Sequence, residues 1–250
     1  MLAAVVGAMA LGSCLATKYQ MAPKDTLPAV ALDIATAQPP VALALRAVIV
    51  YNGPGSWKRD ALWDEYVVTI LNQSESALTI DAAALLDPAG EPRVPGSDPW
   101  NLEEASQTLE QRYVRAGIAF ARSEIPDAVA FGAGAVGSAA GSLFTTASAT
   151  AATASVVALP VYYVVVYGVD RSNKAAVRKE FTRRRLVLPH ALAGGETMTG
   201  SLFFPMTPAP RSLNLQWAND FGHGSLVLPL PTLQGLHVAP PGKEPAATAP

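Results

Sequence analysis

The stretch ETMTGSLFFPM, residues 196–206, decides the fold of this chain because its apolar residues recur at every second position. Side chains of a β-strand point alternately to the two faces of the sheet, so this spacing gathers one set on a single face. That set is Met198, Gly200, Leu202 and Phe204. The stretch therefore predicts a strand whose apolar face must be buried against a second layer.

Further strand signals lie on both sides of a long central segment. They are runs of β-branched or alternating residues that are bounded by turn residues, at 41–51, 65–72, 76–86, 181–188 and 211–217. Their sequential order is typical of antiparallel pairing. Because each sheet has one apolar face to bury, the predicted fold is mainly β, an antiparallel β-sandwich over residues 41–238.

The central segment predicts a long helical insertion at about 101–180, which makes the fold α+β overall. Asn101 followed by Glu104 resembles a capping box, and apolar residues at helical spacing extend the expected helix over 101–121. Residues 128–169 contain no charged side chain. This uncharged part has three interpretations: a hairpin packed on the sandwich or on sister subunits, an arm that enters the bilayer, or a pair of strands.

The Ala/Gly-rich stretch GAGAVGSAAG, residues 132–141, contains the glycine spacing of a dinucleotide-binding loop. Such a loop follows a strand, and an acidic residue lies about 20 positions beyond it. Here a helix start precedes the glycines, and no acid occurs between Asp127 and Asp170, so we expect no nucleotide. The glycines fit close helix packing or self-association better, through Gly134, Gly137 and Gly141.

The N-terminal stretch MLAAVVGAMALGS, residues 1–13, is an uncharged apolar run that ends in small residues. Its length suits a signal peptide and falls short of the ~20 residues of a membrane-spanning helix. The only cysteine of the chain, Cys14, follows at once. Leu11-Gly12-Ser13-Cys14 resembles the lipobox of bacterial lipoproteins. The resemblance implies removal of residues 1–13 and a covalent lipid on Cys14, and we expect no other cofactor.

The resemblance also implies a location. Residues 14–40 contain four prolines and little periodicity, which predicts a flexible tether behind the lipidated cysteine. Because no Asp follows Cys14, sorting by the lipoprotein rules implies the outer membrane, with the protein facing the periplasm. The NQS-type turn and the late LFFP strand resemble the immunoglobulin-like domains common in bacterial lipoproteins. The Pro-rich residues 239–250 are expected to form a disordered tail.

Charge is sparse and uneven. Only 15% of the residues are charged, against about 25% in ordinary soluble proteins, and the net charge is −2, so we expect no nucleic-acid partner. Seven of the 18 basic residues fall within 171–185. This run is either a solvated face or a patch for anionic lipid or an acidic partner. The candidate patch comprises Arg178, Lys179, Arg183, Arg184 and Arg185.

Signals of catalysis are scarce. Neither His190, His223 nor His237 lies at metal-ligand spacing from another His or Cys, and the chain contains no G-x-S-x-G. We therefore expect no catalytic residue and no metal site. The predicted function is a non-enzymatic, lipid-anchored envelope lipoprotein with a binding or assembly role through the sandwich and the apolar insertion, in which residues 128–169 bind a protein partner or another copy of the chain. The alternative is an envelope hydrolase with a Ser, a His and an Asp assembled from loops.

Overall fold

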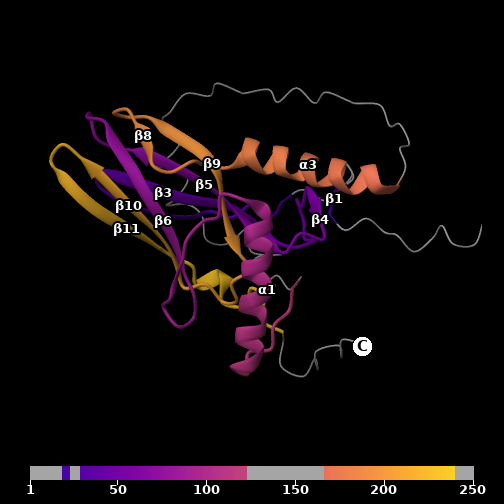
Figure 1. Cartoon of the computed structure of the whole chain (residues 1–250). Coiled ribbons are helices and arrows are strands. Elements are labelled where there is room, and N and C mark those ends of the chain that lie inside the picture. The colour runs from indigo at the N-terminus through magenta and orange to yellow at the C-terminus, as the bar shows by residue number, and fades with distance from the viewer. Residues whose placement is uncertain (1–18, 23–28, 123–165, 240–250) are drawn as a thin grey trace, which may run out of the picture.

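The computed structural model describes residues 19–22, 29–122 and 166–239 (Figure 1). Within them the chain is mainly β, and its strands form antiparallel open sheets. The first sheet has the strand order β2-β3-β5-β9. Its strands are β2 (Ile34–Gln38), β3 (Val41–Ile49), β5 (Trp63–Asn72) and β9 (Thr197–Pro205).

The second sheet has the order β11-β10-β6-β7, and a short strand, β8, pairs with β6 beside this path. Its strands are β6 (Leu78–Leu86), β7 (Pro92–Arg93), β8 (His190–Leu192), β10 (Ser212–Asn219) and β11 (Gly222–Pro229). A separate two-stranded ladder joins β1 (Gln20–Met21) to β4 (Lys58–Arg59). The arrangement of the two larger sheets is consistent with a β-sandwich.

The main core lies between the two larger sheets, and side-chain alternation explains how it forms. The even-numbered residues of β5 and β9 point inward, so that Tyr66 and Phe204 meet edge to face with ring centroids 5.3 Å apart. Apolar residues of β6, β10 and β11 complete the same cluster from the facing sheet. The prediction that Leu202 and Phe204 share one buried face is confirmed, since both are fully buried there.

Both faces of the LFFP stretch are buried, because a helix covers the outer face of the first sheet. Phe203 points away from the main core and stacks on Phe181 of α3 (Val166–Arg184) with ring centroids 4.1 Å apart. Trp63 packs edge-on against both rings. This second, smaller core fastens α3 to the sheet, and Figure 1 shows the helix lying beside β9 and β1.

The remaining helix, α1 (Pro99–Arg115), packs against the ends of β5 and β9, and a 3₁₀ turn η3 (Pro231–Leu233) follows β11. Asp98 caps α1, since its carboxylate accepts the backbone N–H of Trp100 at 2.9 Å. The predicted helix over 101–121 therefore begins two residues earlier and ends at Arg115, where Gly117 takes a φ of +79° and the chain turns. None of the helices among the described residues is long and apolar enough to cross a membrane.

Two sequence predictions are wrong in the described regions. Residues 181–184 continue helix α3 instead of forming a strand over 181–188. The reason is that Phe181 lies one helical turn after Val177, and both side chains are buried in the second core. Residues 14–40 are not one flexible tether: β1 pairs with β4, and β2 adds an edge strand to the first sheet. The folded body therefore includes residues that precede the predicted boundary at 41.

Several predicted features lie outside the described residues. They are the signal peptide at 1–13, the lipidation site Cys14, the glycines Gly134, Gly137 and Gly141, nearly all of the uncharged stretch 128–169, and the tail from 240. The predicted helical insertion at about 101–180 is therefore described only at its two ends, α1 and α3.

Candidate functional site

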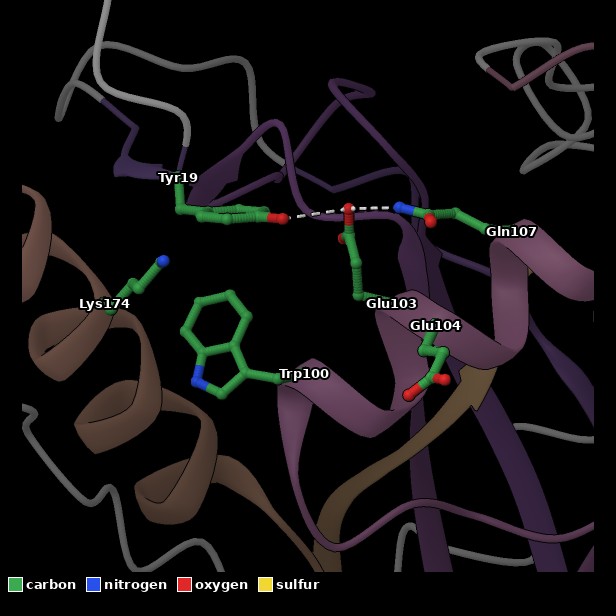
Figure 2. A pocket seen from close by; sticks show the side chains of 6 residues that line it. All are labelled: Tyr19, Trp100, Glu103, Glu104, Gln107 and Lys174. Carbon is green, nitrogen blue, oxygen red and sulfur yellow. Dashed lines mark hydrogen bonds between the residues drawn. The ribbon is translucent and has the colours of Figure 1, made fainter.

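A hollow of about 250 Å³ lies where the N-terminal segment, α1 and α3 meet. We call it the Tyr19 pocket. Its lining, drawn in Figure 2, comprises Tyr19, Trp100, Glu103, Glu104, Gln107 and Lys174. The N-terminal segment supplies the tyrosine, α1 supplies the next four residues, and α3 supplies the lysine. Residues more than 150 positions apart thus form one small surface.

Tyr19 is docked on α1 through both its ring and its hydroxyl group. Its ring lies 4.8 Å from the ring of Trp100, and its hydroxyl donates to Glu103 Oε1 at 3.2 Å. Its backbone φ of +67° is uncommon for a bulky residue. Such a conformation persists only where surrounding contacts hold it. The docking therefore fixes the point at which the N-terminal chain joins the folded body.

The charges of the pocket are arranged around the two rings. The Lys174 ammonium lies 5.4 Å from the centre of the Tyr19 ring and 6.0 Å from that of Trp100, within the range of a cation–π contact. Figure 2 shows the lysine reaching toward both rings from α3. The buried Glu103 also accepts the backbone N–H of Leu62 at 2.6 Å, which ties α1 to the loop before β5. The pocket thus combines aromatic faces, an ammonium group and carboxylates.

A buried carboxylate holds the other end of α3. Glu65 of β5 is fully buried and accepts hydrogen bonds from Ser201 Oγ at 2.6 Å and from the Trp57 indole. Arg184 reaches the same carboxylate at 3.5 Å, and its guanidinium lies 5.2 Å from the centre of a Trp57 ring. Glu180 bridges Arg184 to Arg183, and these hydrogen bonds lower the Glu180 pKa to about 2. This network holds the C-terminal end of α3 against the first sheet.

The predicted basic patch divides into two groups. Arg184 and Arg185 are half-buried beside the sheet, whereas Arg178, Lys179 and Arg183 are exposed on α3. Arg178 makes an ion pair of 3.0 Å with Asp98, the cap of α1. Exposed ion pairs of this kind contribute about 0–1 kcal/mol and open easily. Three of the five predicted patch residues therefore remain accessible to an anionic partner.

A longer groove of about 640 Å³ runs along the other side of α1. We call it the α1 groove. Its wall is the loop around Val94 and Pro95, and its floor includes the buried Leu102 and Leu109. Val94 is 70% exposed and adds an aliphatic side chain to the lining of the groove. An open, largely apolar groove on a helix suits a peptide segment better than a reacting small molecule.

The histidines are not gathered in a cleft. His237 is fully buried, and its Nε2 lies 2.8 Å from Asp64 Oδ2 while its Nδ1 lies 3.1 Å from the carbonyl oxygen of Ala121. Both ring nitrogens are thereby engaged, so this imidazole has none left for a serine. His190 is half-buried and His223 is exposed, at separate places on the second sheet. Within the described ranges, no three His, Cys, Asp or Glu side chains are grouped to hold a metal ion.

Lys58 is a further buried ionisable group. Its ammonium donates to the carbonyl oxygens of Ala61 and Trp63 at 2.9 and 2.6 Å and lies 4.0 Å from the centre of the Trp63 ring. Burial lowers the Lys58 pKa to about 8, although nearby carboxylates oppose the shift. Because its donors are already satisfied, Lys58 holds the turn between β4 and β5.

No family model, curated protein or solved structure matches this chain. The site is therefore judged on its geometry. The sequence did not indicate the Tyr19 pocket, because its residues come from three distant segments, each with an ordinary local role. The one available signal was the pair of aromatic residues Tyr19 and Trp100 in otherwise polar, charged or Pro-rich surroundings.

Proposed function

We propose that this protein is a lipid-anchored, non-enzymatic lipoprotein of the bacterial cell envelope that binds a partner beside its helices. Its body is an immunoglobulin-like sandwich, and a diacylglyceryl group on Cys14 holds it to the outer membrane on the periplasmic side. The proposal rests on the lipobox-like residues 11–14 together with one structural observation. This observation is the docking of Tyr19 between α1 and α3.

The position of Tyr19 supports the anchor because of how the chain enters the body. Cys14 lies five residues before Tyr19 in the sequence. A tyrosine fixed by ring packing and a hydrogen bond would keep a lipid anchor on the nearby Cys14 close to α1 and α3. A loosely attached leader would need no such contact.

The α1 groove supports the binding role. It offers apolar surface with a charged rim that includes Glu104 and Arg112, which is the composition of a site for a protein segment. The uncharged residues 128–169 join the region of α1 to α3 and form the second proposed interaction element, for a protein partner or for self-association.

Lipidation is tested by labelling cells that produce the full chain with radioactive palmitate. We expect label on the wild-type protein, and no label and a loss from the membrane fraction for Cys14→Ser. Ser13→Ala keeps a small residue before the thiol and should behave like wild type. Label on Cys14→Ser equal to that on wild type would remove the proposal.

A further inference from the structure

We propose that the α3 side of this protein lies on the surface of an anionic phospholipid bilayer, through the exposed cations of α3 and the aromatic rings of the Tyr19 pocket. The proposal deepens the proposed function, and its argument from chain length rests on acylation of Cys14. The surface chemistry of α3 supports the proposal whether or not Cys14 is acylated.

Only a short length of chain joins Cys14 to the docked Tyr19. Tyr19 lies five positions after Cys14, and a fully extended chain spans at most about 3.6 Å per residue. The docked Tyr19 can therefore lie no more than about 18 Å from the acylated cysteine. The predicted tether of about 25 residues would have allowed the body to move much farther. Docking of Tyr19 keeps the adjacent face of α3 close to the lipid headgroups.

Basic side chains are exposed on α3 and on β4. Arg178, Lys179 and Arg183 are exposed on α3, and Arg59 is exposed on β4, the partner of β1. A basic side chain near an anionic bilayer strengthens binding about fivefold. The attraction between these cations and the anionic lipids acts within a Debye length of about 8 Å at physiological salt. A folded body held near the membrane by a short chain would therefore be drawn onto its surface.

Neighbouring acids, including the exposed Glu104 of the Tyr19 pocket, reduce this attraction. Asp98 pairs with Arg178, and Glu180 pairs with Arg183. The exposed pair between Arg178 and Asp98 is weak, so the Arg178 guanidinium can exchange this carboxylate for a lipid phosphate, which it binds with two parallel hydrogen bonds. Lys179 is exposed beside them and adds a further positive charge.

The aromatic rings of the Tyr19 pocket also suit a membrane surface. Tyr19 and Trp100 are each only partly buried, and Met21, two residues after Tyr19 in the sequence, is 40% exposed. Tyr and Trp are enriched at membrane–water interfaces, where an apolar ring with a polar tip matches the headgroup region. Lys174 extends from α3 toward these rings, as Figure 2 shows, and brings a positive charge of α3 beside them.

The experiment uses the unacylated Cys14→Ser chain, so that binding does not depend on the lipid anchor. Sedimentation is measured with vesicles of phosphatidylcholine alone and with vesicles containing about one third phosphatidylglycerol. We expect binding at least about tenfold stronger to the anionic vesicles, weakening as salt is raised. Adding Arg178→Gln, Lys179→Gln and Arg183→Gln together should abolish most of this preference.

The matched control removes three exposed arginines elsewhere, through Arg115→Gln, Arg122→Gln and Arg211→Gln, and should keep the preference. Circular dichroism establishes that all variants are folded. Equal binding to both vesicle types, or equal losses in the two triple variants, would overturn the inference. Binding to an acidic polypeptide through Arg178, Lys179 and Arg183 without binding to anionic vesicles would overturn it in favour of an acidic protein partner. If palmitate labelling fails while the vesicle result holds, only the proposed function is lost.

Discussion

His237 and Asp64 lie 173 positions apart in the chain and meet in a fully buried contact of 2.8 Å. Burial alone would lower the His237 pKa, but the Asp64 carboxylate and the backbone hydrogen bonds raise it above its ordinary value of 6.5. The ring nitrogens face a carboxylate and a carbonyl oxygen, which are both acceptors. The imidazolium form therefore satisfies both, and the contact ties the end of the chain to β5.

This contact predicts a pH dependence of stability. A histidine whose pKa is raised on folding stabilises the protein fully below its unfolded pKa, and this stabilisation is lost as pH rises through the raised folded pKa. We expect the free energy of unfolding to fall as pH rises from about 6.5 through that higher value. His237→Phe should keep the stacking on Phe120, remove this slope, and cost about 3–5 kcal/mol because the Asp64 charge stays buried.

Denaturant unfolding at a series of pH values measures the effect. The exposed His223→Gln provides the control, because it removes a histidine outside the core and should leave the slope intact. A His237→Phe variant with the same slope as wild type would show that another group causes the pH dependence.

At the scale of secondary structure, Asp98 has two separable roles. Its carboxylate caps α1 through the N–H groups of Trp100 and Asn101 and also pairs with Arg178 of α3. Asp98→Ala removes both and should cost about 0.5–2 kcal/mol, mainly through the lost cap. Asp98→Asn keeps the capping oxygen and loses only the weak ion pair, so it should cost well under 1 kcal/mol.

The two variants are compared by denaturant unfolding. Equal costs above about 1 kcal/mol would contradict the capping role and assign the effect to the contact between α1 and α3.

Local patterns predicted most of the strands, because alternation reports directly on a half-buried strand. The strands near 41–51, 65–72, 76–86, 196–206 and 211–217 are found with bounds shifted by one or two residues. β11 was not predicted because its glycines weaken the strand signal, and one of them, Gly224, lies against the ring of Trp217, where a Cβ would clash. β2 was not predicted because it looked like part of a Pro-rich tether.

Helix α3 and the candidate site depend on long-range packing that local patterns do not carry. The run FTRRR has strand-like alternation, yet Phe181 turns into the cluster of Trp63 and Phe203 and the helix continues. The Tyr19 pocket joins Tyr19, Trp100 and Lys174 from three segments, so no spacing within one segment could indicate it. The exposed basic run was predictable from composition, but its division into packed and accessible residues was not.

At the scale of the whole molecule, the chemistry that suits binding is concentrated on one side. The Tyr19 pocket, the α1 groove and the exposed cations of α3 all surround the two helices, whereas the sheets bury their apolar faces against each other and α3. The N-terminal chain reaches the body on this same side, at Tyr19. A lipid at Cys14 would therefore place the helical side, and not the far strand ends, at the membrane.

The chemical state of Cys14 is the most direct test of this account. The full chain is produced in a bacterial host and extracted from its membranes, and the mass of its N-terminal peptide is measured. The account predicts a peptide that begins at Cys14 and carries a diacylglyceryl group on sulfur and a further acyl chain on its amino group. A peptide that retains residues 1–13 with an unmodified Cys14, or that begins beyond Cys14, would contradict it.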